Sequence, residues 1–323
     1  MSGFEDTAGS RLSVGCVAVV LTVMNEAAGI WELLGSIDSQ TMLPDEVVIC
    51  DAGSTDATLD RIEAWRATTP VGAVQVIVRP GANIARGRNI AIGATRAELI
   101  AVTDGGCVLD PAWLEEITGP LRDGSVDAVY GGTRAIGVSL VGRAFAEYYD
   151  WRIEARSTNT EHSSRSVAFR RVAWERVGGY PEWMELAGED TVFFAALDAA
   201  GGASVRRSAV VEWTHGAESL KRVFRMHKRN SVGEGEARMW PLRFLVLALL
   251  YAGGGGLMLR ARRGERIPMI MAAAWIAATI GRDTPGVAIR SRSATVSLVP
   301  LITASRDLGM LTGYAEGLLK RRS

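Results

Sequence analysis

Acidic residues stand at three places where a predicted α/β fold could do chemistry. Asp51 and Asp104 each end an apolar strand pattern, and Glu189-Asp190 come directly before a predicted helix. In an open α/β sheet, ligands bind beyond the carboxyl ends of the strands. Carboxylates in that position can hold a base, a sugar or a metal ion, or accept a proton. Together with their neighbours, these residues indicate a nucleotide-sugar site.

Two polar turns follow the first two predicted strands. In Asp51–Asp56, Gly53 permits a tight turn and Asp56 can cap the next helix, which leaves Asp51 free to accept hydrogen bonds from uracil or guanine. The alternative for Asp51 is an Asx turn without a ligand. The first turn lacks the Gly-x-Gly-x-x-Gly pattern of a dinucleotide site. Its Asn25 therefore either contacts a base or ribose, or only caps a helix.

Two arginines lie near the start of a predicted helix, at positions 86 and 88. Residues two apart do not share a helix face. We therefore expect one arginine to meet a phosphate or Asp104 and the other to face solvent.

Alternating strand and helix patterns predict an α/β fold with a mostly parallel sheet. The apolar run 14–23 is typical of a buried parallel strand. Further strands are expected at 46–50, 74–78, 99–103, 126–130, 163–169 and 203–213, and helices at 84–95, 112–121, 140–154, 171–177, 190–200 and 218–238.

The charge of the chain is divided between its two parts. The 323 residues have no net charge, but residues 1–200 carry 16 basic and 28 acidic side chains, whereas residues 201–323 carry 20 and 8. The acidic part fits a metal-dependent site and the basic part fits an anionic surface. Because the basic part is also apolar, a membrane is favoured over nucleic acid. The three cysteines and the polar N-terminus indicate a reducing compartment and no signal peptide.

The basic part contains two uncharged apolar stretches, 244–259 and 267–281, separated by the arginine-rich segment 260–266. Each is shorter than the about 20 residues of a perpendicular membrane span. We expect a re-entrant or interfacial hairpin at the cytoplasmic face of the cell membrane, which keeps the arginines at the anionic inner surface. The alternatives are helices of a soluble bundle or an oligomer interface.

The ordered motifs resemble those of the family 2 glycosyltransferases. The resemblance covers about residues 15–230 and rests on Thr22-Val23-Met24-Asn25-Glu26, Asp51–Asp56, Arg88-Asn89, Asp104 and Gly188-Glu189-Asp190. It implies a GT-A fold, a nucleotide-diphosphate sugar donor, Mg²⁺ or Mn²⁺, and inversion at the anomeric carbon. The implied donor-binding residues are Thr22, Asn25, Glu26, Asp51, Ser54, Arg88 and Asp104.

The resemblance also implies roles on the acceptor side. Asp190 is implied as the catalytic base, ionised at neutral pH, whereas Glu189 is expected to point away or hold a helix end. The segments 166–171 and 178–182 are similar to the family's sequence before that base and help to shape the acceptor side.

One position departs from the family's Asp-x-Asp metal motif. It begins at Asp104, but Gly106 stands where the second Asp is expected. Asp104 then binds the metal with a second ligand from elsewhere, because a divalent ion needs further oxygens or an imidazole. His215 is the candidate because it ends a predicted strand. Its alternative is a structural histidine.

These observations predict three regions: a leader (1–14), a GT-A-like domain (15–230) and a helical, membrane-associated extension (231–323). The predicted function is sugar transfer to a saccharide or lipid-linked acceptor, in the synthesis of the cell envelope, a glycolipid or a polysaccharide. One alternative is a sugar nucleotidyltransferase, which needs a glycine-rich basic loop that residues 24–30 lack. The other is a catalytically impaired nucleotide-sugar binding protein, motivated by Gly106.

Overall fold

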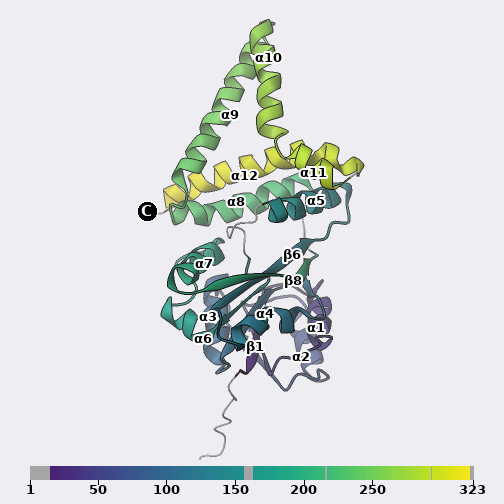
Figure 1. Ribbon diagram of the computed structural model, residues 1–323, viewed down its shortest axis with the longest axis vertical. Helices are drawn as coiled ribbons and strands as arrows, with labels where there is room; N and C mark the ends of the chain where they lie inside the picture. The colour runs from purple at the N-terminus through teal and green to yellow at the C-terminus, as the bar shows by residue number, and fades with distance from the viewer. Residues whose placement is uncertain (1–14, 156–162, 215–216, 292, 321–323) are drawn as a thin grey trace, which may run out of the picture.

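The computed structural model describes residues 15–155, 163–214, 217–291 and 293–320. Within these ranges it confirms the α/β fold: eight strands form one mixed sheet, in the order β3-β2-β1-β4-β7-β6-β8-β5, and helices flank it (Figure 1). The strands are β1 (Val17–Val23), β2 (Glu46–Asp51), β3 (Ala73–Val78), β4 (Leu99–Asp104), β5 (Cys107–Leu109), β6 (Ala128–Ala135), β7 (Val167–Arg170) and β8 (Ala203–Trp213).

The central strands are covered on both faces, which explains their continuous apolar sequences. Alternate residues of β1 enter two separate hydrophobic cores, Val19 and Leu21 on one side and Ala18 and Val20 on the other. β1 to β4 pair in parallel, whereas β7 and β5 run antiparallel to their neighbours. The expectation of a mostly parallel sheet therefore holds. β5 was not predicted, because three residues are too few to show a period.

Helices fill both sides of the sheet, and the helix bounds agree with the sequence patterns to within a few residues. One core receives side chains from α1 (Ile30–Asp38), α2 (Thr58–Arg66), α4 (Trp113–Arg122) and α5 (Leu140–Ala155). The other receives them from α3 (Ile84–Ala94), α6 (Arg171–Arg176) and α7 (Glu189–Ala200).

A layer of helices follows the sheet in the chain. Its two long members, α8 (Leu220–Glu236) and α12 (Val299–Lys320), run parallel with their backbones in contact. A Cβ atom on Gly313 would lie 2.1 Å from the carbonyl oxygen of Lys228, and the glycines four residues before and after it meet α8 in the same way. Glycine therefore permits this contact, as in other closely packed helix pairs with small residues four apart. α8 runs through residue 230, where we placed the domain boundary, and that division remains a proposal.

A helical hairpin projects from this layer (Figure 1). It consists of α9 (Pro241–Ala261) and α10 (Arg266–Trp275), which a π-helical segment, η1 (Ile276–Ile280), continues. The chain then returns through α11 (Thr284–Arg290) and the short η2 (Ala294–Leu298) to α12. The hairpin exposes large apolar side chains in succession along both helices, among them Leu242, Leu245, Val246, Leu249, Leu250, Leu259, Ile267, Met269, Ile270 and Met271.

Candidate active site

The turns after β1 and β2 are bonded to each other. The Asn25 side-chain oxygen accepts the Thr55 N–H at 2.8 Å, and the Asn25 N–H donates to the Ser54 hydroxyl at 2.9 Å. Asn25 has a left-handed backbone, with φ 56°. The capping alternative for Asn25 is wrong, because α1 begins later, after Gly29, and has no side-chain cap. The sequence pattern could not show this, because the partner lies 30 residues away in the chain.

Asp51 forms the Asx turn that its sequence allowed, and its other carboxylate oxygen is left for the second interpretation, which stays a prediction. One carboxylate oxygen accepts the N–H groups of Gly53 and Ser54, each at 2.8 Å, which forms the Asx turn. The second oxygen, Oδ2, is buried and has no hydrogen-bond partner among the described residues. A buried carboxylate oxygen without a donor is costly. It is therefore a ready acceptor for a ligand N–H.

Asp56 does not cap α2 as expected, because α2 begins after Ala57 without a side-chain cap. Its carboxylate accepts the Ala27 N–H at 3.1 Å and the Thr58 N–H at 3.0 Å, and it also bonds the Thr58 hydroxyl. The Thr58 hydroxyl bond is the main reason why the pKa of Asp56 is lowered. Asp56 therefore holds the β1 turn against the β2 turn.

Arg88 is the centre of a buried charge cluster. Its guanidinium is 2.6 Å from an Asp104 oxygen and 2.5 Å from a Glu189 oxygen, and Tyr180 lies beside it with 5.2 Å from Arg88 Cζ to the ring centroid. Arg88 is 1% exposed, whereas Arg86 is exposed, as the spacing predicted. The expectation that Glu189 points away is wrong, because its buried carboxylate is paired with the Arg88 guanidinium.

Asp190 lies in the first turn of α7, beside this cluster. Its pKa is raised to about 7, first by burial and then by the neighbouring Glu189 carboxylate, while Arg88 opposes the rise. We expected Asp190 to be ionised at neutral pH, and its surroundings shift it toward the protonated form. A carboxylate with a pKa near the working pH is suited to general base catalysis.

Sequence analysis did not identify a second arginine at this edge of the sheet. Arg165 precedes β7, and its guanidinium stacks on the Trp213 ring with 4.1 Å from Cζ to the centroid. The charges of Asp104 and Asp190 both act on it. The sequence alone could not place it, because its position depends on the antiparallel pairing of β4 with β7. Val167 pairs with Val102 there, so Arg165 lies opposite Asp104 if the register is continued.

The β4–β5 turn carries the residue that departs from the metal motif. The Gly106 carbonyl accepts both the N–H and the hydroxyl of Thr214, at 3.0 and 2.9 Å. A Cβ on Gly105 would lie 2.8 Å from Glu26, so the Glu26 side chain packs on this turn. His215 follows Thr214 but lies outside the described residues, and its expected role stays a prediction.

The expected donor-side residues gather at one edge of the sheet. The strand register places Thr22 beside Asp104 and Val23 beside Asp51. A Cβ on Gly87 would lie 2.9 Å from Thr22, so α3 closely approaches this edge and brings Arg88 with it. The residues brought together are Thr22, Asn25, Glu26, Asp51, Ser54, Arg88, Asp104 and Asp190.

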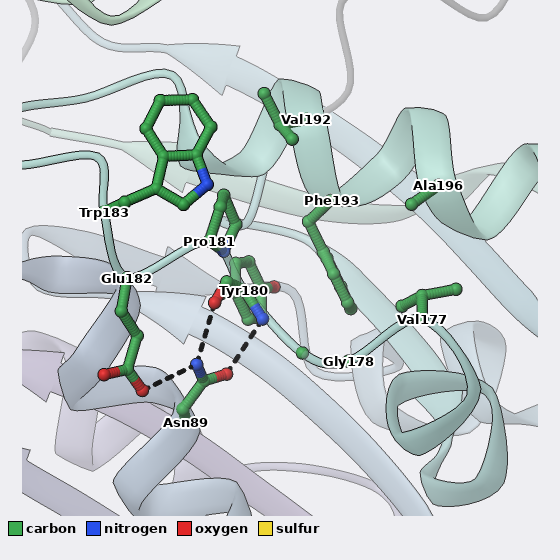
Figure 2. Close-up of a pocket in the computed structure, with 11 residues that line it drawn as sticks. Asn89, Val177, Gly178, Tyr180, Pro181, Glu182, Trp183, Val192, Phe193 and Ala196 are labelled. Carbon is green, nitrogen blue, oxygen red and sulfur yellow. Dashed lines mark hydrogen bonds between the residues drawn. The ribbon is translucent and has the colours of Figure 1, made fainter. Parts of the chain in front are cut away.

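A cavity of about 460 Å³ lies between α7 and the segment 177–183 (Figure 2). Asn89 supports its wall by accepting the Tyr180 N–H at 2.9 Å and donating to the Glu182 carboxylate at 3.0 Å. Val192 and Phe193 of α7 line it, but Asp190 does not. Phe193 lies three residues after Asp190 and so on the same side of α7. The cavity therefore lies beside segment 178–182 and near the start of α7, without including the expected base.

Comparison with known proteins identifies the class of this fold. Over 94% of this chain and 87% of the other, it matches the structure of the mannosyltransferase PcManGT from Pyrobaculum calidifontis in complex with GDP-Man and Mn²⁺, with a TM-score of 0.61 and 20% identity. The fold is thus GT-A-like, with additional C-terminal helices.

The sequence comparisons identify the family. The model of glycosyl transferase family 2 matches residues 18–175. The glycosyltransferase AglE of Haloferax volcanii is 28% identical over 251 residues, which are 73% of this chain and 78% of AglE. The hyaluronan synthase of Pasteurella multocida is 29% identical over 185 residues, 56% of this chain but only 18% of that enzyme. The part of the chain that this model matches belongs to the family 2 glycosyltransferases.

Proposed function

We propose that this protein is an inverting glycosyltransferase that moves a sugar from a nucleotide-diphosphate donor to an acceptor hydroxyl. The observation that carries the proposal is the position of Asp190, whose pKa is about 7, beside the cluster of Arg88, Asp104 and Glu189. Asp190 would in this position supply a proton acceptor next to the strand edge where the donor-side residues gather, which supports the proposal.

The reaction is a single displacement. The acceptor oxygen forms a bond to the anomeric carbon while the bond from that carbon to the diphosphate oxygen breaks and its electron pair leaves with the diphosphate. Asp190 takes the acceptor proton, which is possible when the two oxygens are within about 3 Å. Attack from the face opposite the leaving group inverts the anomeric carbon.

A divalent ion, Mg²⁺ or Mn²⁺, is part of this proposal. Only one Asp104 oxygen is bonded to Arg88, so the other can bind a cation. His215, which lies outside the described residues, is proposed as a second ligand, because carboxylate and imidazole together suit Mn²⁺. Among the described residues, no three His, Cys, Asp or Glu side chains are grouped for a metal, so the ion would also rely on the donor. When bound, it would offset charge on the diphosphate.

The proposal is tested with purified protein and a panel of UDP- and GDP-sugars, with and without Mn²⁺. Transfer to added saccharide, or slow donor hydrolysis, is expected with at least one donor, and that donor should raise the melting temperature because a ligand stabilises the folded state. Thermal stabilisation without any turnover would instead favour a nucleotide-sugar binding protein. No stabilisation by any donor would contradict the proposal.

We infer that Asp51 reads the nucleobase through its unpaired Oδ2. Asp51→Asn keeps an oxygen for the N–H groups of Gly53 and Ser54 but can replace the free acceptor with a donor. Nucleoside affinity should therefore fall about 10-fold or more, the effect of an unpaired polar group in a ligand site. Titration with uridine and guanosine measures the loss of affinity. Asp60→Asn, at an exposed position of α2, is the control. Unchanged nucleoside affinity would place the base elsewhere.

We further propose that the α9–α10 hairpin attaches the protein to the cytoplasmic face of a membrane, where it meets a saccharide or lipid-linked acceptor. α9 has 21 residues, and only 11% of its most apolar 18-residue segment is buried inside the protein. It is longer than the uncharged run 244–259, and its length of about 31 Å permits a span. Of the described helices, α9 alone is long and apolar enough to cross a membrane. The four arginines near the hairpin tip oppose crossing and favour a re-entrant or interfacial position.

Cell fractionation tests the attachment. We expect the expressed protein in the membrane fraction, released by carbonate if peripheral and by detergent if inserted. Recovery in the soluble fraction at low salt would contradict attachment. The three native cysteines are buried, so Arg263→Cys adds an accessible thiol at the tip without straining Gly264, whose φ is 80°. Labelling of this thiol from outside intact cells would contradict the cytoplasmic position.

A further inference from the structure

Two arginines lie near Asp104, but only one of them is paired with carboxylates. Both Nη atoms of Arg88 are bonded to carboxylates, and its Nε is buried without an acceptor among the described residues. Asp104 and Glu189 therefore already offset the charge of Arg88, although not all of its N–H groups are bonded.

Arg165 is held differently. One face of its guanidinium stacks on the ring of Trp213, a residue that is 7% exposed. Its Nη1 donates a hydrogen bond to the Ser163 hydroxyl at 3.1 Å. It forms no ion pair with a described carboxylate, although the charges of Asp104 and Asp190 act on it. Stacking fixes the plane of a guanidinium and leaves its N–H edge available.

The strand register shows where that edge lies. Trp213 pairs with Cys107, at the end of the turn that contains Gly106. Arg165 lies opposite Asp104 if the β4–β7 register is continued by two residues. The cation thus stands between the β4–β5 turn and the start of α7. Because Gly106 replaces a carboxylate in this turn, no acidic side chain at that position competes for Arg165.

We propose that Arg165, rather than Arg88, binds the diphosphate of the nucleotide-sugar donor and offsets the charge that develops there as the sugar leaves. This inference rests on the proposed function. A guanidinium donates two parallel hydrogen bonds to phosphate oxygens, and such bonds are worth most in a site shielded from water. Arg88 then has a different task, which is to hold Asp104 and Glu189 in place.

The test compares ligands that differ only in their phosphates. Uridine, UMP and UDP, and guanosine, GMP and GDP, are titrated by calorimetry into the wild type and into Arg165→Met, each with and without Mn²⁺. In the wild type, one series should bind more tightly as phosphates are added. Arg165→Met should weaken the diphosphate by about 10- to 100-fold, the loss of one or more charge-assisted hydrogen bonds, and leave the nucleoside unchanged.

Two further variants complete the design. Arg86→Met removes an exposed arginine of α3 and should change no affinity. Arg165→Lys keeps the charge without the planar fork and should lose several-fold in diphosphate affinity; it decides the question if Arg165→Met does not fold. An unchanged ratio of monophosphate to diphosphate affinity in these Arg165 variants, or an equal loss for the nucleoside, would overturn the role of Arg165. Failure of the wild type to bind either series would overturn the proposed function as well.

Discussion

Asp190→Asn is expected to lower the rate of sugar transfer by about 100-fold or more while leaving nucleoside diphosphate affinity nearly unchanged. The amide has the same size as the carboxylate but cannot accept the acceptor proton. Initial rates at saturating donor measure the loss, and calorimetry with the diphosphate measures binding. Glu185→Gln, an exposed change in the preceding loop, is the matched control. Near-normal turnover of Asp190→Asn would mean that another group is the base.

The raised pKa of Asp190 adds a pH signature to this prediction. Only the ionised carboxylate is a base, so kcat/KM should fall about tenfold per unit as the pH drops below about 7. Stability should show the opposite sign. Because the folded pKa lies above the ordinary value of 3.8, the folded state loses stability as the pH rises from about 4 through 7. Asp190→Asn should therefore unfold at a higher urea concentration than the wild type at pH 8, and a lower midpoint would contradict the buried carboxylate.

Arg88→Met is expected to lower the free energy of unfolding by about 3 to 5 kcal/mol, the usual effect of removing one partner from a buried ion pair. Asp104 and Glu189 would both lose the cation that pairs with them. Because Glu189 is only 4% exposed, water cannot solvate its carboxylate in place of Arg88. Urea unfolding measures the change. Arg86→Met is the control, because it removes the same side chain from an exposed position of the same helix.

A double variant separates charge from packing. If Arg88→Met destabilises because it leaves charge uncompensated, adding Glu189→Gln should restore part of the lost free energy. No recovery would indicate that packing against Tyr180, and not the ion pairs, is the main contribution of Arg88. A loss below about 1 kcal/mol in Arg88→Met would contradict the cluster as a structural element, since that is the range of exposed pairs.

Local sequence patterns determined most of the fold. The apolar runs of β1, β2 and β4 predicted buried parallel strands, and their polar ends predicted an edge with Asp51 and Asp104. These features follow from residues close together in the chain, because a strand buried on both faces must be continuously apolar. The same patterns indicated the two apolar stretches that form α9 and α10.

Other features depend on contacts between distant residues. Asn25 and Asp56 have good capping chemistry, but each bonds across to the other turn instead of capping its own helix. Local preference cannot show this, because either use satisfies the side chain equally well. Similarly, the role of the α12 glycines, which is to permit close backbone contact, becomes evident only when α8 is seen packed against them.

The division of tasks among the charges was decided by the tertiary structure. The sequence predicted that Asp104, Asp190 and one of the two arginines near the start of α3 belong to the candidate site. Only packing decided that this arginine is Arg88, paired with Glu189 and Asp104, and that Arg165, just before β7, keeps its free edge. The physical reason is that burial sets the cost of an unpaired charge, and burial depends on the whole fold.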